Sequence, residues 1–422
     1  MPVHVIIGAQ WGDEGKGKIV DYLSGRSQMV IRFQGGPNAG HTIINEYGEF
    51  KLHSIPSGIF HPNTTCIIGA GTVLSPPQFA EELAVVQRTG ISVEHLVISD
   101  RAHLIMPWHA IREDIEESAL GDRKIGTTRK SIGPTYADRY GRWGITTGDL
   151  AHRDWLFKRV SDILKIKNAE LACFDKKMFK LDDIMDKLSD WYKILQPFID
   201  DTVPMIRRAL EKDDTILLEG QLGIGKGVIW GSYPYVTSSS PTAGGATVGT
   251  GIPPYRITDV IGVVKAYSTS VGAGPMVTED ETDIGPRLRE LGHEFGATTG
   301  RPRKCGWLDS VILKYGAAIN GYTTLAVTRL DILDTIDPIG ICVAYEQKDG
   351  TIIDHMPTTP VLETCRPILE FVPGWKTSTR HCRDRKSLPT EALDYIARIE
   401  SYAGARAGYI SVGPRREETI MG

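Results

Sequence analysis

Residues 8–18, GAQWGDEGKGK, form a glycine-rich run that could hold a phosphate group. They follow an apolar stretch with Val3, Val5 and Ile7, and they lead into a second apolar stretch that begins at Ile19. A strand followed by a glycine loop and a helix turns backbone N–H groups toward a phosphate, and the N-terminus of the helix adds partial positive charge. The run therefore predicts a site for a phosphorylated nucleotide.

The segment from Gly12 to Lys18 matches the first part of the P-loop pattern GxxxxGK, but Ile19 stands where that pattern has Ser or Thr. The hydroxyl that usually binds magnesium is therefore missing. Asp13 and Glu14 lie inside the loop, and a carboxylate beside transferring phosphates is tolerated when it binds the metal or takes a proton. Asp13 is the first catalytic candidate, and the alternative is a glycine-rich turn with solvated acids.

A second glycine-rich turn, GGPNAGHT at 35–42, follows the strand-like MVIRFQ at 29–34. Two such turns at the ends of parallel strands lie on one edge of a sheet, where open α/β folds bind their ligands. His41 stands between Gly40 and Thr42, where we expect no helical or strand face to bury it. We therefore interpret His41 as a catalytic rather than a structural histidine.

The rest of the chain alternates apolar runs with amphipathic helical patterns. Strands are expected at 96–100 and 215–220, and a helix is expected at 107–120. Strands separated by helices favour an α/β fold with a mainly parallel central sheet and helices on both faces. The two glycine turns would lie at one edge of that sheet.

Two segments depart from this alternation. Residues 151–212 are almost continuously helical in pattern and predict a helical insertion. Asp349 and Gly350 mark a hairpin tip, which predicts a small antiparallel element. No linker divides the chain, so we expect a single domain over residues 1–422.

Composition limits the class of protein. With 41% hydrophobic and 24% charged residues, the chain can bury a large core. A net charge of −4 gives no basic footprint for nucleic acid, and no 18-residue apolar run predicts a membrane span. The six cysteines form no CxxC pair, and the N-terminus lacks the form of a signal peptide. We expect reduced thiols in a cytoplasmic protein, with neither nucleic acid nor membrane as partner.

Seven separated motifs carry a family resemblance. In chain order they are QWGDEGKGK, GGPNAGHT, SYPYVTSSS with TAGG, KAYSTSVGAGP, TTGRPRKCGWLD, TRLDILD and SVGP. Together they resemble the adenylosuccinate synthetase family over nearly the whole chain. The resemblance implies GTP-dependent ligation of L-aspartate to IMP, which gives adenylosuccinate, GDP and phosphate through a 6-phosphoryl-IMP intermediate. This reaction is the first committed step from IMP toward AMP.

The resemblance also implies roles for the residues of the first two motifs. Asp13 would take the N1 proton of IMP, so that O6 attacks the γ-phosphate of GTP. His41 would stabilise or protonate the phosphoryl region, and Lys16 would neutralise phosphate charge. Asp13 and the carbonyl of Gly40 would hold Mg²⁺, a hard cation that prefers oxygen ligands.

The remaining assignments carry over by position in the motifs. GTP is assigned to Gly12, Gly15, Gly17, Lys18, Gly40, Thr42, Arg303, Arg329, Asp331, Ser411 and Gly413. IMP is assigned to Asn38, Thr128, Arg142, Leu222, Thr237, Val271 and Arg301. Aspartate is assigned to Thr299, Arg301 and Arg303. Arg142 matches an arginine that family members reach across a two-fold interface, so a homodimer is expected.

Physical chemistry supports two of these assignments independently. Asp331 is suited to accept the N1 and N2 hydrogens of guanine, although a strand-end Asp is also a common helix cap. Arg301 and Arg303 are planar donors for a dicarboxylate, and they converge only if the backbone turns at Pro302. Arg329 keeps the charge of the family's lysine with different packing.

The chain departs from the family on the IMP side. In EGQLG at 219–223, Leu222 replaces a glutamine that would contact the purine, and that hydrogen bond is lost unless Gln221 swings in. An unmatched polar atom on the base costs on the order of 1–3 kcal/mol. Further departures are Arg129 at a glycine position, Lys130 at an arginine position, Ser270 in place of an arginine, and GKGVIWG at 225–231.

Two alternatives therefore stay open at this point. The first is a paralogous aspartate ligase that acts on another purine nucleotide such as GMP or dGMP; phage relatives of that kind lack the base Asp, whereas Asp13 is present here. The second is a non-catalytic nucleotide-binding paralogue. It is disfavoured because Lys16, His41, Arg301 and Arg303 are all retained with Asp13.

Overall fold

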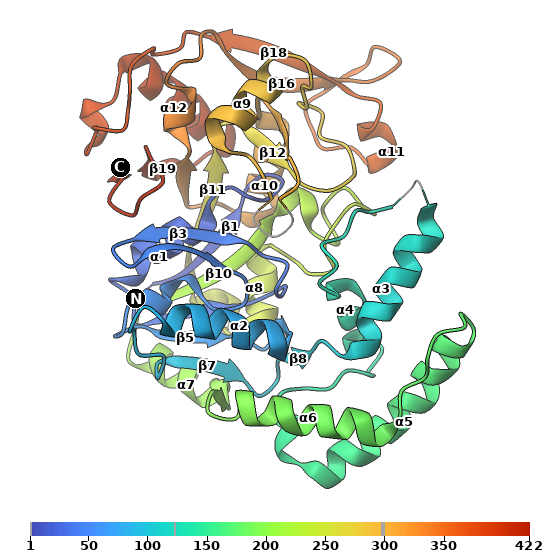
Figure 1. The fold of residues 1–422 in the computed structure, drawn as a ribbon. Helices are drawn as coiled ribbons and strands as arrows, with labels where there is room; N and C mark the ends of the chain where they lie inside the picture. Colours follow the sequence, from blue (N-terminus) through green and yellow to red (C-terminus); the bar gives the residue numbers. More distant parts are fainter. Residues whose placement is uncertain (1, 122–123, 297–299) are drawn as a thin grey trace.

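The computed structural model describes residues 2–121, 124–296 and 300–422. Within these residues a ten-stranded sheet forms the centre of the molecule (Figure 1). In spatial order its strands are β20 (Thr419–Met421), β19 (Arg406–Ser411), β15 (Thr324–Thr328), β11 (Ile257–Lys265), β1 (Val3–Gly8), β10 (Ile216–Gly223), β2 (Met29–Arg32), β5 (Thr65–Ile68), β7 (Leu96–Ser99) and β9 (Ile199–Asp200). Neighbouring strands are parallel except for β19 and β20. The predicted mainly parallel sheet is confirmed.

Helices cover both faces of this sheet, as the alternation of its side chains requires. In β1, Ile7 belongs to one buried cluster and Ile6 to the other. The Ile7 cluster is completed by α7 (Thr202–Glu211), α8 (Ala243–Thr250), α9 (Ile284–Gly292), α10 (Ser310–Asn320) and α12 (Thr390–Ala403). The Ile6 cluster is completed by α1 (Lys16–Ser24), α2 (Pro76–Gln87), α5 (Arg153–Ala172) and α6 (Leu181–Leu195).

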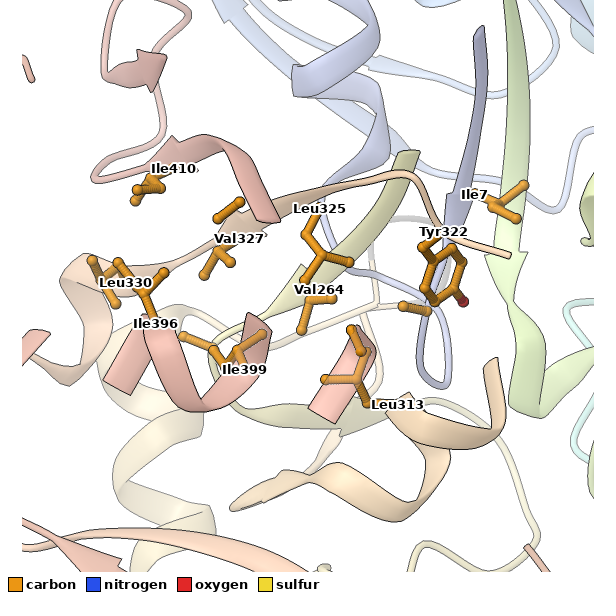
Figure 2. Packing of buried hydrophobic residues seen from close by; sticks show 14 of the residues in the cluster. Ile7, Val264, Leu313, Tyr322, Leu325, Val327, Leu330, Ile396, Ile399 and Ile410 are labelled. Carbon is orange, nitrogen blue, oxygen red and sulfur yellow. The ribbon is translucent and has the colours of Figure 1, made fainter. Parts of the chain in front are cut away.

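Figure 2 shows the first of these clusters at close range. Leu313 of α10 and Ile399 of α12 point toward Val264 of β11 and Leu325 of β15, and all four side chains are fully buried. Burying an aliphatic side chain of this size contributes about 1.5–3 kcal/mol. The centre of the sheet is therefore a rigid base for the loops at its edge.

The segment 151–212 holds α5, α6 and α7, with the short strand β9 between α6 and α7. In Figure 1 these helices gather near β7, at the end of the sheet opposite β16 (Ile339–Glu346) and β18 (Arg366–Val372). The helical pattern is confirmed, but nothing in the sequence pattern indicated that β9 would extend the central sheet by pairing with β7.

The predicted antiparallel element is present near the C-terminus. β16 pairs antiparallel with β17 (Ile352–Ile353) and with β18. Gly350 adopts a φ of 85° in the connecting turn, where its N–H donates to the carbonyl of Gln347 at 2.9 Å. A positive φ at this point explains why a glycine follows Asp349.

The remaining strands and α-helices of the described residues are short or lie beside the sheet. They are β3 (His41–Asn45), β4 (Gly48–Leu52), β6 (Val73–Leu74), β8 (His103–Leu104), α3 (Pro107–Leu120), α4 (Ile132–Tyr140), β12 (Ser268–Ser270), β13 (Lys304–Gly306), β14 (Leu308–Asp309) and α11 (Thr359–Leu362). No described helix combines the length and the apolarity that crossing a membrane requires. All six cysteines are free thiols.

Candidate active site

A cavity of about 1540 Å³ opens where the parallel strands β1, β10, β11 and β15 end. Most residues assigned from the sequence line it: Asp13, Gly15, Lys16, Gly17, Lys18, Asn38, Gly40, His41, Thr42, Thr128, Leu222, Thr237, Val271, Arg301, Arg303, Arg329, Ser411 and Gly413. Gly12, Arg142 and Asp331 are not part of this lining, and Thr299 lies outside the described residues. The edge of the sheet was thus predicted correctly, while the ligand assigned to each residue stays a prediction.

The loop between β1 and α1 takes its shape from three residues with positive φ. Gly12, Asp13 and Gly15 have φ angles of 99°, 60° and 91°. Gly15 is the N-cap of α1, so the first turn of that helix opens at the cavity. Backbone N–H groups at a helix N-terminus favour an anion.

The buried carboxylate of Glu14 stabilises this loop through hydrogen bonds to its backbone. The side chain is fully buried, and its Oε1 accepts hydrogen bonds from the N–H groups of Gln10 at 3.2 Å and Gly12 at 2.8 Å. Its Oε2 forms an ion pair with Lys16 Nζ at 2.5 Å. Glu14 therefore has a structural role that the loop sequence did not reveal, and Lys16 enters the cavity as a paired cation.

His41 differs from the sequence expectation. It begins β3, pairs with Leu52 of β4 and is 7% exposed, so the prediction that no strand would bury it is wrong. The hairpin from 41 to 52 was missed because its polar, short strands follow a glycine turn directly. The side chain nevertheless lines the cavity.

Glu219 is the partner of His41. The distance from His41 Nδ1 to Glu219 Oε1 is 2.5 Å, and Glu219 also accepts from the N–H and hydroxyl of Ser57 at 2.9 and 2.5 Å. Burial lowers the pKa of His41 despite this carboxylate. Burial works in the opposite direction on Glu219, but the hydrogen bond from His41 leaves the pKa of Glu219 lowered. A neutral imidazole that donates from Nδ1 to a carboxylate anion satisfies both directions.

Arg303 lies between two carboxylates. Its Nε is 3.0 Å from Asp13 Oδ2, and its Nη1 is 2.5 Å from Glu294 Oε2. Burial would lower the pKa of Arg303, but the charges of Asp13 and Glu294 raise it overall. The guanidinium is thus a permanent cation held against the side chain of the candidate base.

Glu294 holds Arg303 through a buried network. Its Oε1 accepts from Lys265 Nζ at 3.0 Å and from the hydroxyl of Tyr267 at 2.5 Å. Burial alone would raise the pKa of Glu294, yet the charges of Lys265 and Arg303 hold it far below the usual range. These contacts hold Glu294 in place, and Glu294 in turn fixes the position of Arg303.

On the cavity lining, Gln221 lies beside Asn38. Its Nε2 donates to Asn38 Oδ1 at 2.8 Å, and its Oε1 accepts from Arg32 Nη2 at 2.6 Å. Gly35 leaves the room for this amide, because a Cβ there would overlap it. Gln221 therefore lies next to the cavity with both ends of its amide already engaged.

Asp331 is not part of the cavity lining, and one of its two carboxylate oxygens has no hydrogen-bond donor among the described residues. Its Oδ2 accepts from Arg380 Nη2 at 3.1 Å, while its buried Oδ1 accepts no hydrogen bond from the described residues. Burial raises the pKa of Asp331, against the charges of Arg329 and Arg380. A buried acceptor without a donor is suited to a ligand N–H.

Lys18 connects the first loop to the C-terminal turn. Its Nζ donates to Ser411 Oγ at 2.6 Å, to the carbonyl of Gly413 at 2.6 Å and to the carbonyl of Glu418 at 3.0 Å. Burial lowers the pKa of Lys18 to about 7, although Glu418 opposes the shift. This lysine brings two loops that are far apart in the sequence to one side of the cavity.

The donor set fits magnesium bound together with a nucleotide. No group of three or more His, Cys, Asp or Glu side chains among the described residues could hold a metal ion alone. Mg²⁺ usually takes one or two protein carboxylates, with phosphate oxygens and waters as its other ligands. Asp13 offers one carboxylate on the cavity lining, and Gly40 lies on the same lining.

Sequence reasoning missed the functional environment of four buried residues. Glu14, Glu219 and Glu294 anchor Lys16, His41 and Arg303 respectively. Lys226 also lines the cavity and was not singled out. Glu219 carried a signal that could have found it, because it ends an apolar strand run at the ligand edge of the sheet. Glu294 carried none, since its partners are distant in the sequence.

Comparison with known proteins agrees with this geometry. The family model described as adenylosuccinate synthetase matches residues 5–420. An adenylosuccinate synthetase of Dehalococcoides mccartyi is 46% identical over 422 residues, with full coverage of both chains. That of Lactococcus lactis subsp. lactis is 43% identical, with coverage of 99% of this chain and 98% of the relative.

Two solved structures share the fold. A fully ligated adenylosuccinate synthetase from Plasmodium falciparum superposes with a TM-score of 0.92 at 35% identity, over all of both chains. The succinoaminodeoxyadenylate synthetase of cyanophage S-2L, bound to dGMP and dATP, has a TM-score of 0.63 at 19% identity and covers all of this chain and 95% of its own. The second likeness supports the fold alone. Because the family model and the relatives span essentially the whole length, the chain belongs to the adenylosuccinate synthetase family, whose members are ligases.

Proposed function

We propose that this protein joins L-aspartate to IMP at the expense of GTP and forms adenylosuccinate, GDP and phosphate through 6-phosphoryl-IMP. The observation that carries the proposal is the convergence of Asp13, His41 and Arg303 on one cavity beside a helix N-terminus. The reaction needs a base for the acceptor, a binding site for phosphate and cations for a dicarboxylate. All three lie on the same lining.

The first step is proton transfer from N1 of IMP to the carboxylate of Asp13. The electron pair of the N–H bond then places negative charge on O6, which attacks the γ-phosphorus of GTP as the bond to the bridging oxygen breaks and GDP leaves. The amine of aspartate then adds at C6, loses a proton and displaces the phosphate. The ion pair with Arg303 at 3.0 Å holds the carboxylate of Asp13 in place on the cavity lining. The substrate aspartate would bind the same guanidinium. The carboxylate of Asp13 and a carboxylate of the substrate would then share the positive charge of Arg303.

His41 is suited to the phosphoryl group because Glu219 holds its Nδ1 proton. The neutral ring leaves Nε2 as its other polar atom. A phosphate dianion next to the imidazole favours the protonated form, which then donates to a phosphoryl oxygen. The carboxylate behind the ring stabilises that cation.

GTP is the proposed phosphoryl donor, and Asp331 is its selectivity residue. The Oδ1 atom of Asp331 is buried and accepts no hydrogen bond among the described residues. Guanine offers N1 and N2 hydrogens to such an acceptor, whereas adenine has a bare N1. Mg²⁺, held by Asp13 and the Gly40 carbonyl, would neutralise phosphate charge in the site.

A homodimer is proposed from the location of Arg142. This residue is exposed, has a φ of 67° and is not part of the cavity lining of its own chain, yet it is assigned to IMP. Tyr140 and Trp143 beside it are 73% and 37% exposed. Aromatic and arginine side chains are enriched at protein interfaces. We therefore propose that Arg142 completes the site of a second copy, in a cytoplasmic enzyme.

The deciding experiment is a spectrophotometric assay with GTP, Mg²⁺ and aspartate, in which IMP, dIMP, GMP and XMP are offered in parallel. Product formation with IMP supports the proposal, and preference for GMP or dGMP would replace it by the paralogous ligase. No product and no GDP release with any acceptor, from a folded protein, would indicate a non-catalytic paralogue.

Asp13→Asn tests the base within the same assay. Because the amide cannot take the N1 proton, turnover with IMP should fall by at least about a hundredfold. Asp349→Asn, at the exposed hairpin tip, is the matched control and should keep the parent rate. Near-normal turnover of Asp13→Asn would remove the base assignment.

A further inference from the structure

Lys226 is a buried cation on the lining of the cavity that the proposed mechanism does not use. It ends the 3₁₀ helix η4 (Ile224–Lys226), which directly follows β10, and it is 6% exposed. Its Nζ donates to the carbonyl of Ala273 at 3.4 Å, which is a long contact for a buried ammonium group.

The other buried lysines nearby are better satisfied. Lys16 has a carboxylate at 2.5 Å, and Lys265 has one at 3.0 Å. Among the described residues no carboxylate lies within ion-pair distance of Lys226. Burial lowers its pKa to about 8, with Lys304 adding to the shift and Asp13 opposing it. An uncompensated buried charge costs stability, and such groups concentrate at functional sites.

Two neighbouring residues of β10 line the cavity together with Lys226, and neither presents a charged donor. Leu222, four residues earlier, presents an aliphatic side chain to the cavity. Gln221 uses its amide on Arg32 and Asn38. Asp13 and Lys226 line the same cavity, and the charge of Asp13 opposes the lowering of the pKa of Lys226, so the ammonium and the proposed base border one space.

Building on the proposed function, we propose that Lys226 is a further catalytic residue, whose ammonium donates to the 6-oxo oxygen of the acceptor nucleotide and stabilises the negative charge that forms there. As Asp13 takes the N1 proton, the electron pair of the N–H bond delocalises onto O6. Lys226 binds that oxyanion through a hydrogen bond and keeps its own proton. An ammonium group only donates, so it selects a 6-oxopurine and offers nothing to a 6-amino group.

The test compares Lys226→Met with the parent protein. Methionine keeps the length and burial of the side chain but removes the charge and the donor. With GTP and aspartate saturating, kcat for IMP should fall by about a hundredfold, as when a donor to a developing oxyanion is lost, while KM for IMP changes much less. The melting temperature should stay level or rise, because no charge is buried any longer.

Two further variants complete the design. Lys177→Met, an exposed lysine in the α5–α6 connection, should keep the parent kcat. In the Lys226→Met background, Leu222→Gln should restore part of the lost kcat, since an amide donor returns to the same side of the cavity. If Lys226 had only a structural role, Lys226→Met would not lower kcat while the melting temperature stayed level. Leu222→Gln would then not restore kcat either.

The outcomes separate this inference from the function beneath it. If the parent protein forms no product with IMP, the proposed function fails irrespective of Lys226. If the parent is active and Lys226→Met stays within about threefold of its kcat, the inference is overturned. A higher KM for IMP at unchanged kcat also overturns it, because that result marks binding without charge stabilisation.

Discussion

At the scale of single residues, the site is built from charged side chains that hold one another. Glu219 orients His41 through a 2.5 Å contact, and Glu294 holds Arg303 at 2.5 Å. The residues that touch substrate in the proposed mechanism were recognisable in the sequence. Their buried partners were not, because a carboxylate acquires such a role only from what the fold places beside it.

Glu219→Gln tests whether the carboxylate behind His41 matters for catalysis. The amide keeps the size of the side chain but no longer stabilises a protonated imidazole, so kcat should fall by about tenfold to a hundredfold. Steady-state kinetics with IMP, GTP and aspartate measure this effect. Glu346→Gln, an exposed residue at the end of β16, is the control. An unchanged kcat would show that His41 acts without its buried partner.

Lys226 also predicts a pH dependence of stability. Its pKa is about 8 in the folded protein, against an ordinary value of 10.5. Below pH 8 both states carry the proton, so the folded state bears the full penalty, on the order of 3 kcal/mol. Between pH 8 and 10.5 the unfolded state binds more protons, so stability rises with pH and the penalty disappears. The advantage of Lys226→Met in free energy of unfolding should therefore be largest at pH 7.

Thermal or urea unfolding of both proteins at pH 7, 8.5 and 10 measures this advantage. It should shrink steadily across the series, whereas Lys177→Met should differ from the parent by the same small amount throughout. If the difference in free energy of unfolding between Lys226→Met and the parent did not change with pH, the Lys226 side chain would not be a buried titrating ammonium.

At the scale of elements, the first turn of α1 and the start of β3 pack with no space between them. A Cβ added at Gly17 would lie 2.6 Å from the Cβ of His41. Gly17 is therefore needed for a tertiary contact, since its φ is not positive and its backbone does not itself require glycine. The motif alone did not suggest this contact.

Gly17→Ala should displace His41 and lower kcat by about tenfold or more, even though alanine is the better helix former by roughly 1 kcal/mol. Gly244→Ala in α8 is a matched control, since the nearest atom to its added Cβ is Thr242 Oγ1 at 3.9 Å. The control should keep its activity and gain slightly in melting temperature. Full activity of Gly17→Ala would show that the two elements can separate without loss.

At the scale of the whole molecule, the proposed dimer makes two active sites depend on two chains. A mixture of Asp13→Asn and Arg142→Leu proteins tests this directly. If Arg142 serves the neighbouring site, each variant is inactive alone, while every heterodimer holds one intact site. Random exchange of subunits should then restore about a quarter of the parent activity.

Activity of the mixture should rise with the time allowed for subunit exchange, and sedimentation should show a dimer. Arg207→Leu, at an exposed arginine of α7, serves as the control in place of Arg142→Leu, because its mixture with Asp13→Asn should hold half the parent activity at every exchange time. No recovery in the mixture, or sedimentation as an active monomer, would contradict the shared site.

The sequence by itself determined the family, the parallel sheet with helices on both faces and the edge of the sheet where the cavity opens. These follow from local patterns: the glycine loop after β1, the alternation of apolar runs and the spacing of the arginines at 301 and 303. Such signals depend on residues close together in the chain, so they can be read before folding.

Only the tertiary structure decided which charges meet. The pairing of Asp13 with Arg303 joins residues that are 290 positions apart, and that of His41 with Glu219 spans 178 positions. It also decided that Gln221 is engaged at both ends and that Lys226 lies buried beside the cavity without a carboxylate among the described residues. Burial and electrostatic balance are sums over all neighbours in space, and the order of residues along the chain does not specify that sum.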